Sequence, residues 1–106
     1  MLNNRFLNMT ISELAPLIQA REVSPVELTE AALSEAHRQQ PKLNSFITIL
    51  DDQALDQARK LEEEMERGQY RGPLHGIPIG IKDNIATAGI RTTVGAKVLA
   101  DNVPDK

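Results

Sequence analysis

The stretch GIPIGIKDN, residues 76–84, decides which fold the sequence predicts. Its apolar run at 77–81 is typical of a short strand, and the turn signal Gly72-Pro73 lies just before it. Lys82 and Asp83 follow the run directly, so charged side chains are expected at the end of a buried strand. Glycine and proline are frequent from here onward, which indicates that the backbone conformation is closely specified.

A second strand is predicted upstream, at residues 46–50, with the sequence FITIL. This run is apolar and β-branched and lies between Asn44 and Asp51, a pattern typical of a strand buried on both faces. Together with three helices, the two strands predict an α/β fold. Their edges are expected to be exposed, and exposed edges favour a homo-oligomer.

The first helix is predicted from a capping box formed by Thr10 and Glu13. Because Pro16 lies inside the apolar pattern and removes a backbone donor, the helix is expected to kink there or to begin later, with Ser12 as its cap.

The other two helices have local start and stop signals of their own. Residues 24–27, SPVE, predict a second helix from Pro25 to about Gln39, because serine caps and proline favours the first helical position. Asp51 or Asp52 is expected to cap a third helix, which Gly68 ends.

Composition excludes several functional classes. The net charge of −3 gives no basic excess for direct binding to nucleic acid. The absence of cysteine excludes disulfides, thiolate nucleophiles and cysteine-ligated zinc. No apolar run suits a signal peptide or a membrane span, so we expect a soluble, cytoplasmic protein.

Lys82 is the residue whose position suggests chemistry. Burial disfavours the ammonium form of lysine, so a lysine at the end of a buried strand can act as a general base. A structural ion pair with Asp83 explains the same spacing, and the spacing alone favours this second interpretation, because structural ion pairs are common. His37 and His75 have no second histidine at ligand spacing, so no metal site is predicted, and His75 is expected to be an ordinary loop residue.

Residues 76–85 and 89–95, GIPIGIKDNI and GIRTTVG, together resemble the signature of the amidase signature family. The resemblance implies that residues 1–106 are the N-terminal portion of a single amidase domain, helical at 10–68 and carrying the strand and catalytic-lysine loop at 72–100. It also implies the first strands of that family's mixed sheet, here incomplete.

The resemblance further implies hydrolysis of carboxylic amides by a Ser-cisSer-Lys triad, without a cofactor. Lys82 matches the family's lysine, which deprotonates the nucleophilic serine through a bridging serine. Asp83, Thr92 and Thr93 match supporting positions near the site.

The family's serine-rich motif does not occur in the sequence up to Lys106. The four serines, Ser12, Ser24, Ser34 and Ser45, lie at predicted helix caps, on a helix or before a strand, so none is a candidate nucleophile. We therefore expect the isolated chain to be inactive.

Three interpretations stay open for the whole protein. The first is a stand-alone amidase, which the sequence PLHGIP at 73–78 slightly favours. The second is an A subunit of the glutamyl-tRNA(Gln) amidotransferase with partner subunits, and the third is a non-catalytic interaction fragment.

Overall fold

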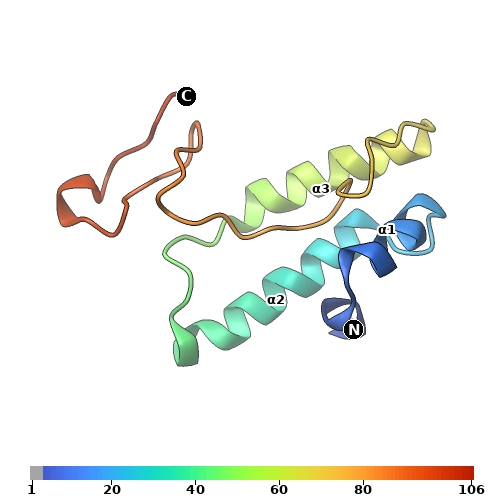
Figure 1. The fold of residues 1–106 in the computed structure, drawn as a ribbon, viewed down its shortest axis with the longest axis horizontal. Coiled ribbons are helices and arrows are strands. Elements are labelled where there is room, and N and C mark those ends of the chain that lie inside the picture. Colours follow the sequence, from blue (N-terminus) through green and yellow to red (C-terminus); the bar gives the residue numbers. More distant parts are fainter. Residues whose placement is uncertain (1–3) are drawn as a thin grey trace.

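The computed structural model describes residues 4–106, and two long helices dominate it (Figure 1). Helix α2 (Pro25–Leu43) and helix α3 (Asp51–Glu66) lie side by side. The short helix α1 (Ile11–Gln19) and the 3₁₀ turn η1 (Asn4–Asn8) pack near the N-terminal end of α2.

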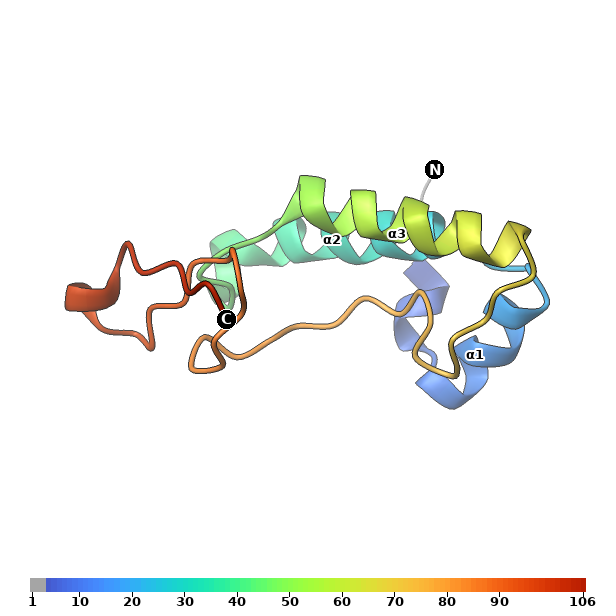
Figure 2. The same ribbon diagram turned by 90° about the horizontal axis from the view of Figure 1, so that it is seen from above.

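The chain after α3 is irregular, apart from the 3₁₀ turn η2 (Lys97–Leu99). It passes back along the α2–α3 pair on the side where α1 lies, and then forms a looped region beyond the pair (Figure 2). The Cα radius of gyration is 15.1 Å, larger than the ~13 Å of a compact domain of this length. The helical part and the looped part therefore form an elongated molecule.

The hydrophobic core lies where α1 meets the beginning of α2. Its buried members are aliphatic except for one phenylalanine: Phe6, Leu14, Ile18, Val23 and Leu28. Ile77 packs against this core from the irregular segment. The core therefore holds the irregular segment at Ile77, whereas the residues of the segment after Ile77 lie outside the core.

The predicted capping box at Thr10 is confirmed and sets the start of α1. The Glu13 N–H donates to Thr10 Oγ1 at 3.1 Å, and the Thr10 N–H donates to Glu13 Oε1 at 2.8 Å. The helix continues through Pro16, so the alternative start after Ser12 is wrong. Pro16 removes one backbone donor inside α1, and both ends of the helix are satisfied by local hydrogen bonds.

The predicted start of α2 is also confirmed, since Ser24 Oγ accepts from the N–H of Val26 at 3.0 Å. The end is later than predicted, because Pro41 lies in the last turn instead of beyond it. Asn44 stops the helix in the left-handed conformation and donates its N–H to Gln40 O at 2.8 Å.

Helix α3 ends as predicted and begins differently. Gly68 has φ +78°, and its N–H and that of Gln69 donate to the last turn of the helix. The N-cap is Leu50, without a side-chain cap, so the prediction of an aspartate cap is wrong. Asp51 lies in the first turn, where a carboxylate favours the helix dipole, and contacts His37 Nε2 at 2.7 Å.

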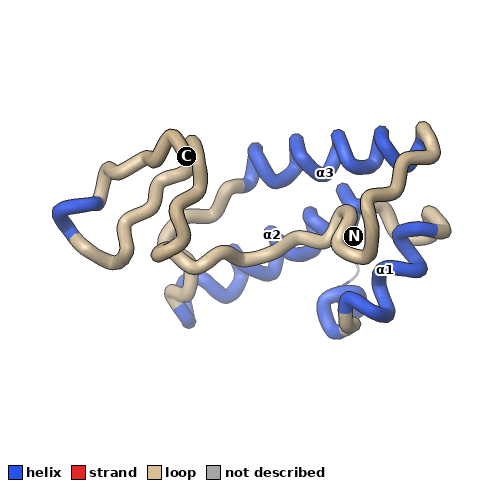
Figure 3. The backbone as a smooth tube through the Cα atoms, turned by 45° about the horizontal axis from the view of Figure 1, so that its top comes forward, coloured by secondary structure: helices blue, strands red, loops and turns tan. Residues whose placement is uncertain are grey.

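The α/β prediction is wrong. Residues 4–106 contain helices and loops and no strand (Figure 3). The runs at 46–50 and 77–81 have the composition of strands, but a strand needs a neighbouring strand for its backbone hydrogen bonds, and the described chain provides none. The strand edges on which the expected homo-oligomer rested are therefore not found either.

Candidate functional site

The Asp83 carboxylate organises the loop that carries Lys82. Its Oδ1 accepts the Thr93 N–H at 2.8 Å, and its Oδ2 accepts the Thr93 hydroxyl in a short hydrogen bond and the Gly95 N–H at 3.4 Å. The Val94 N–H donates to the Asp83 backbone carbonyl at 3.1 Å. These bonds join two segments that the sequence separates by about ten residues.

The same hydrogen bonds favour the ionised form of Asp83. The Thr93 hydroxyl, then the Thr93 N–H, hold the pKa of the carboxyl below its ordinary value of 3.8. The Gly95 N–H and the Arg91 charge act in the same direction with smaller effect. Asp83 is thus an anchor for the loop near neutral pH.

Lys82 begins the turn that contains this anchor, and its carbonyl accepts the Ile85 N–H at 3.0 Å. Its side chain is exposed, and no carboxylate of residues 4–106 forms an ion pair with it. The predicted burial at a strand end is therefore wrong for this chain. The alternative of an ion pair with Asp83 is not found either, because the Asp83 oxygens are occupied by Thr93 and Gly95.

Thr92 and Thr93 are both buried, each with 5% of its surface exposed. The Thr92 N–H donates to Asn102 O at 2.8 Å, and Asn102 Nδ2 donates to Thr92 O at 3.0 Å. Thr92 therefore joins the loop to the end of the chain, while Thr93 joins it to Asp83. The structure brings together the predicted residues Asp83 and Thr93.

Two residues outside the predicted set, Arg91 and Asn102, also hold this region. Arg91 donates to Ala100 O at 2.9 Å, and Asn102 pairs with Thr92 as described. Arg91 was recognisable as the one charged residue inside the GIRTTVG stretch. Asn102 had no signal in the sequence, since asparagine is common in polar segments.

His75 is buried and serves the fold. Its Nδ1 accepts the Arg71 N–H at 3.2 Å, and its Nε2 donates to Leu61 O at 2.9 Å. This partner set matches the tautomer with the proton on Nε2. His75 thus fastens the loop after α3 to that helix. No group of three histidine, cysteine or acidic residues suited to a metal occurs in the described chain.

Comparison with known proteins identifies the family. A family model described as Amidase matches residues 27–106, and the chain belongs to the amidase family. The resemblance recognised in the sequence is thereby confirmed. No solved structure matches the chain.

The chain is similar to curated proteins that carry the name of the glutamyl-tRNA(Gln) amidotransferase A subunit. The relative from Acaryochloris marina is 50% identical over 84 residues, which are 79% of this chain and 17% of the relative. The relative from Thermoanaerobacter pseudethanolicus is 41% identical over 97 residues, 92% of this chain and 20% of the relative. The relative from Carboxydothermus hydrogenoformans is 38% identical over 96 residues, which are 91% of this chain and 20% of the relative. The chain spans about a fifth of the length of these relatives.

The described helices include none that is both long and apolar enough to cross a membrane.

Proposed function

We propose that residues 1–106 form the N-terminal portion of a single amidase domain, with the helical part at 10–68 and the lysine loop at 72–100. Two findings support this assignment: the match to the family model, and the fact that the chain spans only about a fifth of the length of its relatives. The chain after α3 also exposes many large aliphatic side chains: Ile79, Ile81, Ile85, Val94, Val98 and Val103. Surfaces with many such side chains commonly pack against further polypeptide.

Within that domain, we propose that Lys82 is the general base for hydrolysis of a carboxylic amide. The observation that supports this proposal is that the Asp83 carboxylate binds Thr93 and Gly95 and so holds the turn that begins at Lys82. In residues 4–106 no carboxylate forms an ion pair with the Lys82 amine, so the side chain is not bound within this part of the domain.

In this reaction the neutral amine of Lys82 accepts a proton from the nucleophilic serine through the bridging serine. The serine oxygen then attacks the amide carbonyl, and the C–N bond breaks as the proton passes to the leaving amine; water hydrolyses the resulting acyl ester and restores the serine. Asp83, Thr92 and Thr93 are supporting residues that hold the lysine loop. The serines of this chain lie on helices, at a cap or in the loop after α2, so the isolated chain is expected to be inactive.

A second, narrower candidate is the A subunit of the glutamyl-tRNA(Gln) amidotransferase, which releases ammonia from glutamine and works with other subunits. The observation that favours it is the shared name of the curated relatives described above.

The test is a chimera in which this chain replaces the corresponding segment of the Acaryochloris marina relative. It is assayed with glutamine and with simple amides. Lys82→Met should lower kcat by about 100-fold or more, the usual contribution of a general base. Lys97→Met is the matched control, because Lys97 is an exposed lysine of the same region that lies in η2, away from the turn that begins at Lys82, and the variant should retain activity. A Lys82→Met chimera with full activity refutes the proposal.

A further inference from the structure

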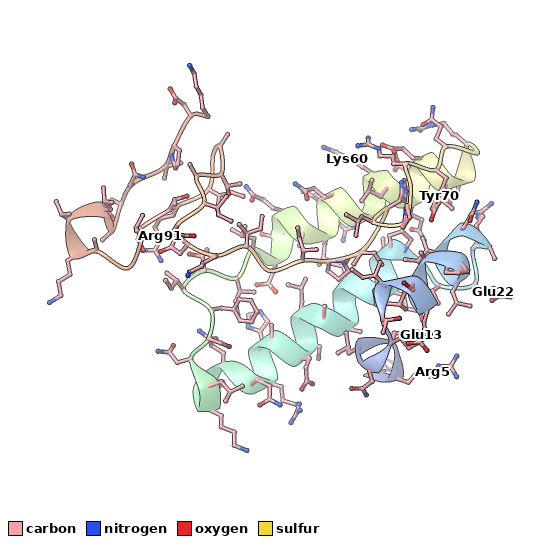
Figure 4. All side chains as sticks on the ribbon, viewed as in Figure 1. Arg5, Glu13, Glu22, Lys60, Tyr70 and Arg91 are labelled. Carbon is pink, nitrogen blue, oxygen red and sulfur yellow. The ribbon has the colours of Figure 1, made fainter. Side chains whose placement is uncertain are left out.

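Arg91 connects three separate parts of the chain. Its Nη1 donates to Ala100 O at 2.9 Å, and its Nη2 lies 3.3 Å from Thr48 Oγ1 and 3.4 Å from Ile47 O. Figure 4 shows Arg91 beside the connection between α2 and α3. The guanidinium therefore bridges the looped region and a connection that lies more than 40 positions earlier in the chain.

The connection that Arg91 contacts is itself held by α2. Gln40 Nε2 donates to Phe46 O at 2.6 Å, and the Phe46 N–H donates to Gln40 Oε1 at 3.1 Å. These two hydrogen bonds hold the backbone of Phe46, the residue directly before Ile47. Arg91 thus binds to a part of the chain that a helix holds in place.

On its other side, Arg91 is followed directly by Thr92 and Thr93. Thr93 donates its N–H and its hydroxyl to Asp83, the neighbour of Lys82. A continuous path of covalent and hydrogen bonds therefore leads from Gln40 through Arg91 and Thr93 to the lysine loop.

We propose that Arg91 is a positioning residue for Lys82, which holds the lysine loop in place relative to the α2–α3 connection. This proposal rests on the proposed function of Lys82. Because the looped region is irregular, a few hydrogen bonds determine where it lies. Arginine suits the task because its planar fork donates in two fixed directions, whereas a lysine amine is a single point of charge.

The first test uses the 106-residue chain itself and measures amide hydrogen exchange by NMR. Arg91→Gln and Arg91→Lys should both accelerate exchange at the Thr92 and Thr93 N–H groups, by about 10-fold for the loss of one or two hydrogen bonds. Exchange within α3 should stay unchanged. Arg59→Gln is the matched control, since Arg59 is an exposed arginine of α3 that pairs with Asp56.

The outcomes distinguish a local effect of Arg91 on the lysine loop from a general effect on folding. Faster exchange at Thr92 and Thr93 alone supports the proposal. Unchanged exchange at both threonines overturns it, and so does equal acceleration in α3, because the substitution would then act on the whole fold.

The second test places Arg91→Lys and Arg91→Gln in the chimera described above. A displaced base slows the chemical step, so kcat should fall about 10-fold or more while KM changes less than about 2-fold. The lysine variant should recover little, because it keeps the charge and loses the fork. A normal kcat, in a chimera that depends on Lys82, overturns the positioning role alone. A chimera that keeps its activity after Lys82→Met overturns the proposed function instead.

Discussion

Gly76 offers a sharp test of how the irregular segment packs on the helices. This buried glycine has φ +80°, and a Cβ atom at its position would lie 2.8 Å from Pro25 Cγ and 3.0 Å from Pro25 Cβ. Pro25 is the buried first residue of α2, and its ring has little freedom to move. Gly76→Ala therefore introduces both backbone strain and a steric clash.

The magnitude follows from the two effects. A left-handed conformation costs an ordinary residue about 1–2 kcal/mol, and overpacking costs about 1–3 kcal/mol. The reduced freedom of the unfolded chain offsets about 0.4–1 kcal/mol. Gly76→Ala should thus lower the free energy of unfolding by about 3 kcal/mol, a large part of the roughly 5–15 kcal/mol typical of a domain.

Gly68→Ala is the matched control for the clash. Gly68 has φ +78°, but no atom lies within 4 Å of the place that a Cβ would occupy, so only the backbone strain applies. Its cost should be about 1 kcal/mol or less. Urea unfolding followed by circular dichroism measures both variants. Equal losses would refute the contact with Pro25, whereas partial recovery in the Gly76→Ala, Pro25→Ala double variant would support it.

Three further outcomes are expected for the same chain. The pKa of Asp83 is lowered in the folded state, so its contribution to stability is present above the ordinary value of 3.8 and is lost as the pH falls through the folded value. Unfolding measured between about pH 6 and pH 2 should therefore depend less on pH in Asp83→Asn, and an unchanged pH dependence would contradict this. Val94 has φ +54° and is exposed, so Val94→Asn should raise the free energy of unfolding by about 0.5–1 kcal/mol in urea titrations. Ser24→Ala removes the cap of α2 and should lower the free energy of unfolding by about 1 kcal/mol. Ser34→Ala, in the same helix, should change the free energy of unfolding little.

The site could be predicted from the sequence only in part. Lys82, Asp83, Thr92 and Thr93 were found through the family resemblance, and the structure joins Asp83 to Thr93. The exposure of Lys82 was not foreseen, because the burial that we expected depended on a strand at 77–81. Arg91 was visible in the motif, but its partners lie in the α2–α3 connection, and no local pattern reveals such a distant contact.

Local sequence signals are sufficient to set the beginnings of α1 and α2 and the end of α3. The capping residues Thr10 and Ser24 and the stop residue Gly68 act on groups within a few positions of themselves, so their effect needs no distant partner. Whether residues 46–50 and 77–81 form strands depends on tertiary structure, because a strand exists only where another strand supplies its hydrogen bonds, and in residues 4–106 neither segment is a strand. The position of the lysine loop likewise depends on tertiary structure, since Asp83 and Arg91 bind residues that only folding brings near.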